Sequence, residues 1–146
     1  MNILAPTVFL LLAAISALHV AWGFGLRWPA ASERELVATV IGANQRTRMP
    51  GLAACLVAAA AIFGAGCTAL LMSSLVAPLL PKRVLTAAGF LWLAIFTLRG
   101  AAAYLPAWRN VFSQAPFARY DPLYYAPLCL FVAFTFAMLL VERLSA

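Results

Sequence analysis

Four long apolar runs occupy most of the chain, at about residues 3–25, 51–77, 84–104 and 122–141. Each holds roughly 20 residues, the length at which an α-helix crosses the hydrocarbon core of a bilayer, about 30 Å thick. Only 10% of the residues are charged, whereas a soluble domain carries about 25%, so this chain could not cover a folded surface in water. We therefore predict an all-α fold, a membrane-spanning four-helix bundle that forms a single domain over residues 1–146.

The connections between these runs predict how the helices are ordered. A tight turn at residues 81–83 and two longer connections at 26–50 and 105–121 make neighbouring helices antiparallel, which gives an up-down-up-down bundle. Both long connections then fall on one membrane side, called the loop side below. In the first connection, Ser32 followed by Glu35 is a capping box, which predicts a short amphipathic helix at the membrane interface between the first two spanning helices. A plain exposed loop is the alternative there.

The start of the fourth run carries several local signals. Asp121 followed by Pro122 is an N-cap and first-turn pair, which predicts that the fourth helix begins there. Pro127 lies in the second turn and removes a backbone hydrogen bond, so the carbonyl near Leu123 needs another donor. We expect Arg99 or a tyrosine hydroxyl to supply it.

The basic residues flank the apolar runs. In a soluble protein, the net charge of +6 and the isoelectric point near 9.9 would suggest a nucleic-acid partner. Beside apolar spans, lipid headgroups account for these residues better, so we predict membrane lipids as partners and no nucleic acid. The loop side carries Arg27, Arg34, Arg46, Arg48, Arg109 and Arg119, and the opposite side carries Lys82, Arg83 and Arg143. By the positive-inside rule, this bias places both termini on the outer, periplasmic side.

Cysteine and histidine usage limits the redox and metal chemistry. Cys55, Cys67 and Cys129 lie inside apolar runs and form no CxxC pair, which favours buried thiols over a disulfide framework. A membrane thiol–disulfide oxidoreductase is a third-ranked alternative, because it would lack the nearby second cysteine that activates the thiol in such enzymes. His19 is the only histidine, and no carboxylate cluster accompanies it. We therefore predict no metal site and assign no cofactor.

Polar residues that are costly in lipid gather at the loop-side ends of the predicted helices. An arginine embedded in lipid costs roughly 2.5–3.5 kcal/mol, so Arg99 must either extend to the headgroups or find a carboxylate. Asp121 is the only acidic residue near this part of the bundle, and a bidentate pair with Arg99 is the inward alternative. His19 shares a helix face with Trp22, which predicts either an interhelical hydrogen bond or an acid–base or ligand-binding group.

The fourth helix adds a stripe of polar and aromatic side chains. Asp121, Tyr124, Tyr125 and Cys129 recur at i, i+3, i+4 and i+8, which is one helix face. Tyrosines at this depth could equally belong to the aromatic belt of the membrane interface. Together with the groups on the other helices, the stripe predicts a polar pocket at the loop-side end of the bundle. The candidate pocket residues are His19, Trp22, Arg99, Asp121, Tyr124, Tyr125 and Cys129.

Three stretches of the sequence resemble a known family. They are residues 17–22 (Ala-Leu-His-Val-Ala-Trp), 98–100 (Leu-Arg-Gly) and 117–129, the last of which ends in Tyr-Ala-Pro-Leu-Cys. They resemble a family of small bacterial four-helix membrane proteins that is catalogued as a domain of unknown function. The resemblance spans nearly the whole chain and implies a multi-pass protein of the bacterial inner membrane. It implies no activity.

Two functions of different classes follow from the pocket and the spans. The first is a membrane protein that binds or acts on a lipid-like or quinone-like molecule, with His19 and Arg99 as the polar contacts. Whether such a protein is an enzyme is left open, and no catalytic residue is assigned. The alternative is an accessory subunit of a larger membrane complex, or a homo-oligomer, in which the small residues of the second helix form an interface.

Overall fold

The computed structural model describes residues 3–73, 75–77 and 79–145, and these residues form helices and loops without a strand. Four helices within these ranges are long and apolar enough to cross a membrane. They are α1 (Leu4–Gly23), α3 (Leu52–Met72), α4 (Lys82–Ala102) and a last helix over Phe117–Ser145. The predicted all-α class and the four apolar helices are confirmed, as expected for a multi-pass membrane protein. The second run ends at Met72, earlier than predicted, and Ser74 of that run lies outside the described residues.

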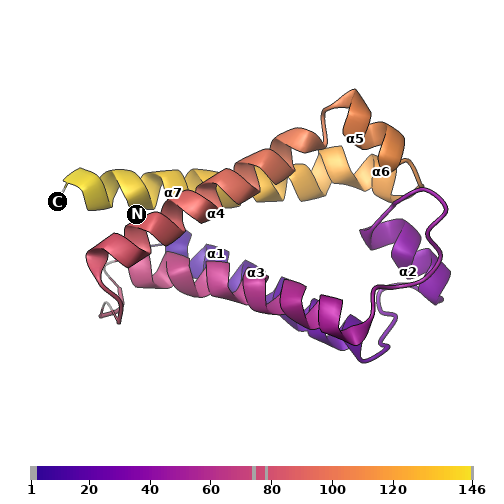
Figure 1. Cartoon of the computed structure of the whole chain (residues 1–146), viewed down its shortest axis with the longest axis horizontal. Coiled ribbons are helices and arrows are strands. Elements are labelled where there is room, and N and C mark those ends of the chain that lie inside the picture. The colour runs from indigo at the N-terminus through magenta and orange to yellow at the C-terminus, as the bar shows by residue number, and fades with distance from the viewer. Residues whose placement is uncertain (1–2, 74, 78, 146) are drawn as a thin grey trace.

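The long helices pack as two pairs, α1 with α3 and α4 with α7 (Ala126–Ser145), as Figure 1 shows. The pairs converge at the end where the two chain termini lie and separate toward the loop side. The buried apolar core accordingly belongs to the convergent end. Its members are Ala5, Val8, Leu12, Ala65, Ala69, Met72, Leu85, Val132, Phe136, Leu139 and Leu140.

Small residues set how closely the two helices of each pair approach. A Cβ added at Gly66 of α3 would lie 3.4 Å from Leu12 of α1, an ordinary contact distance. A Cβ at Gly100, near the end of α4, would lie 2.7 Å from the side chain of Leu130 in α7. Lipid gives helices no hydrophobic reason to associate, so such close backbone approach is a main source of cohesion. A Cβ at Gly64, by contrast, would meet no atom within 4 Å, so this glycine makes no such close approach.

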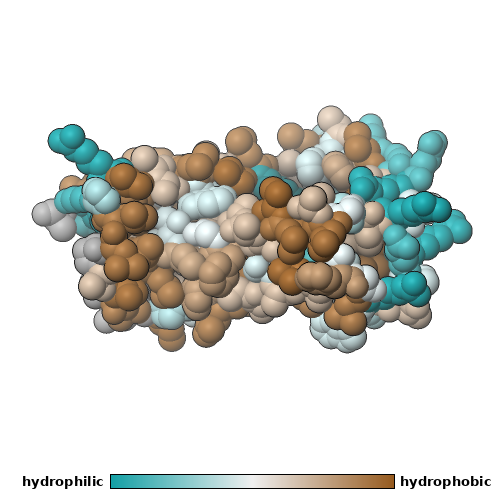
Figure 2. Space-filling view, turned by 60° about the horizontal axis from the view of Figure 1, so that its bottom comes forward, coloured by the Kyte–Doolittle hydropathy of each residue, from teal (hydrophilic) through white to brown (hydrophobic). Residues whose placement is uncertain are grey.

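The outer surface is apolar along most of its length. Large hydrophobic side chains such as Leu10, Val57 and Leu98 are 66–70% exposed. Figure 2 shows hydrophobic residues over the middle of the molecule and hydrophilic residues gathered at its ends. In water such a surface would aggregate, whereas in a bilayer it meets hydrocarbon.

The first long connection folds into α2 (Glu33–Val40), the short helix that the capping box predicted. The Glu35 N–H donates to Ser32 Oγ at 3.2 Å, and the Glu35 carboxylate accepts from the Ala31 N–H at 3.0 Å. The helix is stopped at Gly42, whose φ of +67° suits a residue without a Cβ. Its apolar side chains Leu36 and Val37 are buried inside the protein, between the separated helix pairs (Figure 1), rather than turned to lipid.

Backbone and side-chain hydrogen bonds join the two long connections to each other. The Asn44 N–H donates to the Val111 carbonyl at 3.0 Å, and the Gln114 N–H donates to the Gly42 carbonyl at 3.1 Å. Ser113 Oγ also donates to the Asn44 side chain. The second connection contributes the short helix α5 (Pro106–Val111) to this layer. The loop side is therefore closed by one continuous layer of connections.

The fourth spanning helix begins earlier than predicted. It starts with α6 (Phe117–Tyr120), passes through a π-helical turn, η1 (Asp121–Tyr125), and continues as α7. Asp121 is therefore not an N-cap: it lies one turn inside the helix, and its carboxylate binds other side chains. The sequence rule failed here because it assumed that the aspartate serves its own backbone.

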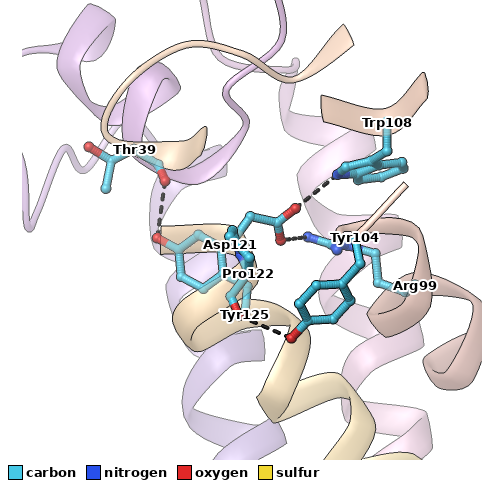
Figure 3. A network of polar contacts seen from close by, with 7 residues as sticks. All are labelled: Thr39, Arg99, Tyr104, Trp108, Asp121, Pro122 and Tyr125. Atoms are coloured by element: carbon cyan, nitrogen blue, oxygen red, sulfur yellow. Dashed lines mark hydrogen bonds and ion pairs between the residues drawn. The ribbon is translucent and has the colours of Figure 1, made fainter. Parts of the chain in front are cut away.

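The π-helical turn also explains which carbonyl is freed. In this turn the Ala126 N–H donates to the carbonyl five residues earlier, at Asp121. Pro127 has no N–H, so by the same spacing the Pro122 carbonyl loses its backbone donor. The Tyr104 hydroxyl donates to that carbonyl at 3.0 Å (Figure 3). The donor is thus a tyrosine, as expected, but the carbonyl lies one residue before the predicted position.

Candidate functional site

The separation of the two helix pairs leaves a cavity of about 750 Å³ toward the loop side. This volume falls within the roughly 300–1,000 Å³ typical of small-molecule sites. All four long helices contribute to the lining, and α2 contributes Thr39 and Val40. Most of the lining is apolar, including Leu12, Ile15, Leu18, Val40, Ile41, Met49, Ala54, Ala58, Ile62, Phe96, Phe117, Leu128 and Val132.

The Arg99 guanidinium is the main polar group at this cavity. Its Nη2 donates to Asp121 Oδ1 at 2.6 Å, and Asp121 is buried with 3% of its side chain exposed. The second carboxylate oxygen, Oδ2, accepts from Trp108 Nε1 at 2.8 Å (Figure 3). The inward alternative therefore describes Arg99 better than extension to the headgroups. The expected bidentate geometry is wrong, because the carboxylate divides its two oxygens between two donors.

This division leaves one arm of the guanidinium free. Arg99 Nη1 is buried and has no hydrogen-bond partner among the described residues. A buried donor without a partner costs about 1–3 kcal/mol, and more when the group is charged. Arg99 also lines the cavity with the exposed part of its side chain, which is 29% exposed.

Trp108 is a site residue that sequence reasoning missed. It lies on α5, and its ring faces the Arg99 guanidinium at 4.8 Å, within the range of a cation–π contact. From the sequence, the aromatic residues of the second connection suit an interfacial layer, and no spacing rule links Trp108 to Asp121. Only the fold of the connection brings its indole N–H onto the carboxylate.

His19 lines the cavity from the opposite helix pair. Its Nδ1 lies 2.8 Å from the Ile15 carbonyl, which can only accept, so Nδ1 carries the proton. The ring packs against Trp22 with centroids 5.1 Å apart. Nε2 is left as the ring nitrogen that can meet a ligand. The Asp121 carboxylate pairs with Arg99 rather than with His19.

The two tyrosines of the fourth helix have different surroundings. Tyr125 lines the cavity, and its hydroxyl donates to the Thr39 carbonyl of α2 at 3.0 Å (Figure 3). Tyr124 is 63% exposed, does not line the cavity and packs edge-on against Tyr120 at 5.8 Å. Its predicted place in the pocket is wrong, because adjacent helical residues point about 100° apart. Tyr124 fits the interfacial alternative.

The structure thus brings together five of the seven predicted pocket residues. Those that line the cavity are His19, Trp22, Arg99, Tyr125 and Cys129. Asp121 lies behind Arg99 and instead faces a smaller cavity of about 280 Å³ beside Trp108. Their roles toward a ligand remain predictions.

The wall of the cavity also carries thiols. Cys55 and Cys129 both line the cavity, and all three cysteines are free thiols. Within residues 3–73, 75–77 and 79–145, no group of three histidine, cysteine or acidic side chains is placed to hold a metal ion. The polar chemistry of the site therefore rests on Arg99, with its carboxylate, and on His19.

Comparison with known proteins adds a family and no activity. No curated protein and no solved structure matches the chain. One family model matches residues 12–136, which include all four spanning helices in whole or in large part and every residue of the site. The chain belongs to the family described as "Protein of unknown function (DUF3995)", which confirms the resemblance to an uncharacterised family of small membrane proteins.

Proposed function

We propose that this membrane protein binds an amphipathic small molecule, lipid-like or quinone-like, in the cavity between the α1–α3 and α4–α7 pairs. One observation carries the proposal: a large, mostly apolar cavity is lined by Arg99, a cationic hydrogen-bond donor whose side chain is 29% exposed. An occupant with an oxygen acceptor would hydrogen-bond to the exposed part of the guanidinium, and its apolar part would fill the rest of the cavity.

The apolar lining argues for such an occupant over water. A buried water usually makes about three hydrogen bonds to protein groups, and apolar cavities therefore tend to stay dry. This lining offers polar atoms mainly at its loop-side end, where Arg99, His19 and Tyr125 lie. A hydrocarbon chain needs no such partners and is abundant in the surrounding membrane.

The two ends of the cavity indicate how the molecule would lie. The head group would contact Arg99 and His19. The apolar part would extend past Ile15 toward Leu12, which also lines the cavity. Leu12 lies seven residues from His19, so at 1.5 Å per residue the apolar part has about 10 Å of depth along α1. The site would thus hold the head group on the loop side and the chain toward the convergent end.

The experiment is to identify what the protein carries out of its native membrane. The purified protein is analysed by native mass spectrometry in a mild detergent, and the released small molecules are identified. Ala58→Phe places a ring in the cavity, whereas Ala60→Phe makes the same change on an exposed position that does not line it. We expect a bound amphiphile in the wild type and the Ala60→Phe variant, and its loss in the Ala58→Phe variant.

Two results would count against the proposal. Equal retention of the molecule by both variants would show that it is detergent-layer lipid rather than a cavity ligand. Recovery of the wild type with no small molecule and a stoichiometric partner protein would favour the accessory-subunit alternative.

A further inference from the structure

We infer that the cavity selects an uncharged amphiphile whose head group accepts a hydrogen bond from Arg99 and donates one to His19. This inference rests on the proposed function and deepens it by naming the chemical class of the ligand. That class is a long-chain hydroxy-carbonyl compound, such as a hydroxylated ester, rather than a fatty acid or a phospholipid.

The charge state follows from the ion pair. Arg99 is the only charged residue among the described residues that line the cavity. Its positive charge is already balanced by Asp121, whose carboxylate lies 2.6 Å from Nη2. The site as a whole is therefore neutral, although Arg99 still offers hydrogen-bond donors on the exposed part of its side chain, which lines the cavity.

A neutral site of this kind is a poor host for an anion. Moving an anion from water or the headgroup layer into an apolar cavity has a desolvation cost of several kcal/mol. Only the attraction of a cation without a counter-charge offsets that cost. A carbonyl or ester oxygen carries a much smaller cost, and a hydrogen bond to a charged donor offsets it. The arrangement should therefore favour the uncharged compound over its phosphorylated counterpart by at least about tenfold in affinity.

The second contact follows from the tautomer of His19. Because Nδ1 donates to the Ile15 carbonyl, a ring that carries a single proton presents Nε2 as an acceptor. An acceptor calls for a hydroxyl on the ligand. Since one hydrogen bond changes affinity by about 2- to 10-fold, a ligand with a hydroxyl should bind tighter than one without it by that factor.

The test compares three probes that share one oleoyl chain. Monooleoylglycerol is uncharged and has an ester carbonyl and hydroxyls, its glycerol phosphate analogue is an anion, and methyl oleate has the carbonyl without a hydroxyl. The affinity of each probe for the full-length protein in detergent is measured by native mass spectrometry. We expect monooleoylglycerol to bind tightest, methyl oleate about 2- to 10-fold more weakly and the phosphate at least about tenfold more weakly.

Two substitutions turn these rankings into a test of the residues. Asp121→Asn removes the counter-charge and leaves Arg99 as an uncompensated cation, so the ranking should reverse in favour of the phosphate. His19→Phe keeps an aromatic ring and removes Nε2, so monooleoylglycerol and methyl oleate should bind equally. A purely structural role for either residue would weaken all probes together and would not change their ratios.

The results of these measurements distinguish a failure of the inference from a failure of the proposed function. If the phosphate binds the wild type as tightly as monooleoylglycerol, the inference is overturned while the proposed function stands. The same holds if Asp121→Asn leaves the ranking unchanged. If no probe binds in a manner that Ala58→Phe abolishes, the proposed function fails and the inference with it. Should Asp121→Asn not fold, the wild-type ratios and the His19→Phe ratios decide.

Discussion

Removing Arg99 alone from the Arg99–Asp121 pair should destabilise the protein more than removing both residues. Asp121 is 3% exposed, so Arg99→Met would leave a carboxylate buried with Trp108 as its remaining donor. Breaking a buried ion pair from one side costs about 3–5 kcal/mol, because the surviving charge stays desolvated. The single variant Arg99→Met should therefore lose about that much free energy of unfolding.

The opposite single variant should be milder on charge grounds. Arg99 is 29% exposed and keeps its contact with the Trp108 ring at 4.8 Å, so it can reach polar surroundings when Asp121 is replaced by Leu. The loss of the acceptor for the Trp108 indole adds about 1–3 kcal/mol. The double variant, Arg99→Met with Asp121→Leu, leaves no charge and keeps only the cost at Trp108, so it should lie about 1–3 kcal/mol below the wild type.

The coupling between the two residues can be bounded from the geometry. Two charges about 4 Å apart attract by roughly 4 kcal/mol at an effective dielectric constant near 20. Because the Arg99 side chain is 29% exposed, solvent screens this attraction. The expected coupling energy is therefore about 2–3 kcal/mol. A double-mutant cycle measures it directly. The four proteins are unfolded under identical detergent conditions, and tryptophan fluorescence follows the transition. A coupling below about 0.5 kcal/mol would refute the view that this pair is the electrostatic centre of the site.

Two further substitutions test the backbone around the site, each with a matched control. Gly42→Ala combines a positive φ with a Cβ that would come within 2.4 Å of Phe117, so we expect a loss of about 2–3 kcal/mol and loosening of α2. Gly25→Ala has a positive φ but open space, and should lose only about 1 kcal/mol; equal losses would contradict the steric part of this reasoning. Tyr104→Phe removes the donor to the freed carbonyl of the π-helical turn and should lower the free energy of unfolding by about 0.5–1.5 kcal/mol. Tyr124→Phe is its control, since that hydroxyl has no partner in the part of the chain that the structure describes. Thermal unfolding measures the stability of both variants, and an equal loss in the two would argue against a special role for Tyr104.

Sequence reasoning about the site succeeded where chemistry left few choices. A buried arginine needs a carboxylate, and Asp121 was the only acidic residue at that depth, so the pair could be predicted without coordinates. The assignment of Tyr124 failed because its side chain turns outward while that of the adjacent Tyr125 turns to the cavity, and no local pattern says which of the two does so. Trp108 was missed because its contact with Asp121 depends on how a whole connection folds back over the bundle.

The sequence by itself determined the fold class, since the length of an apolar run measured against the thickness of a bilayer is a local property. It also indicated α2, with an exposed loop as the alternative, because its capping signal involves residues three apart. Only the tertiary structure decided that the two helix pairs separate on the loop side, that α2 closes the gap, and that Asp121 divides its oxygens between Arg99 and Trp108. These features arise from contacts between distant segments, and their energies depend on distances that no sequence pattern encodes.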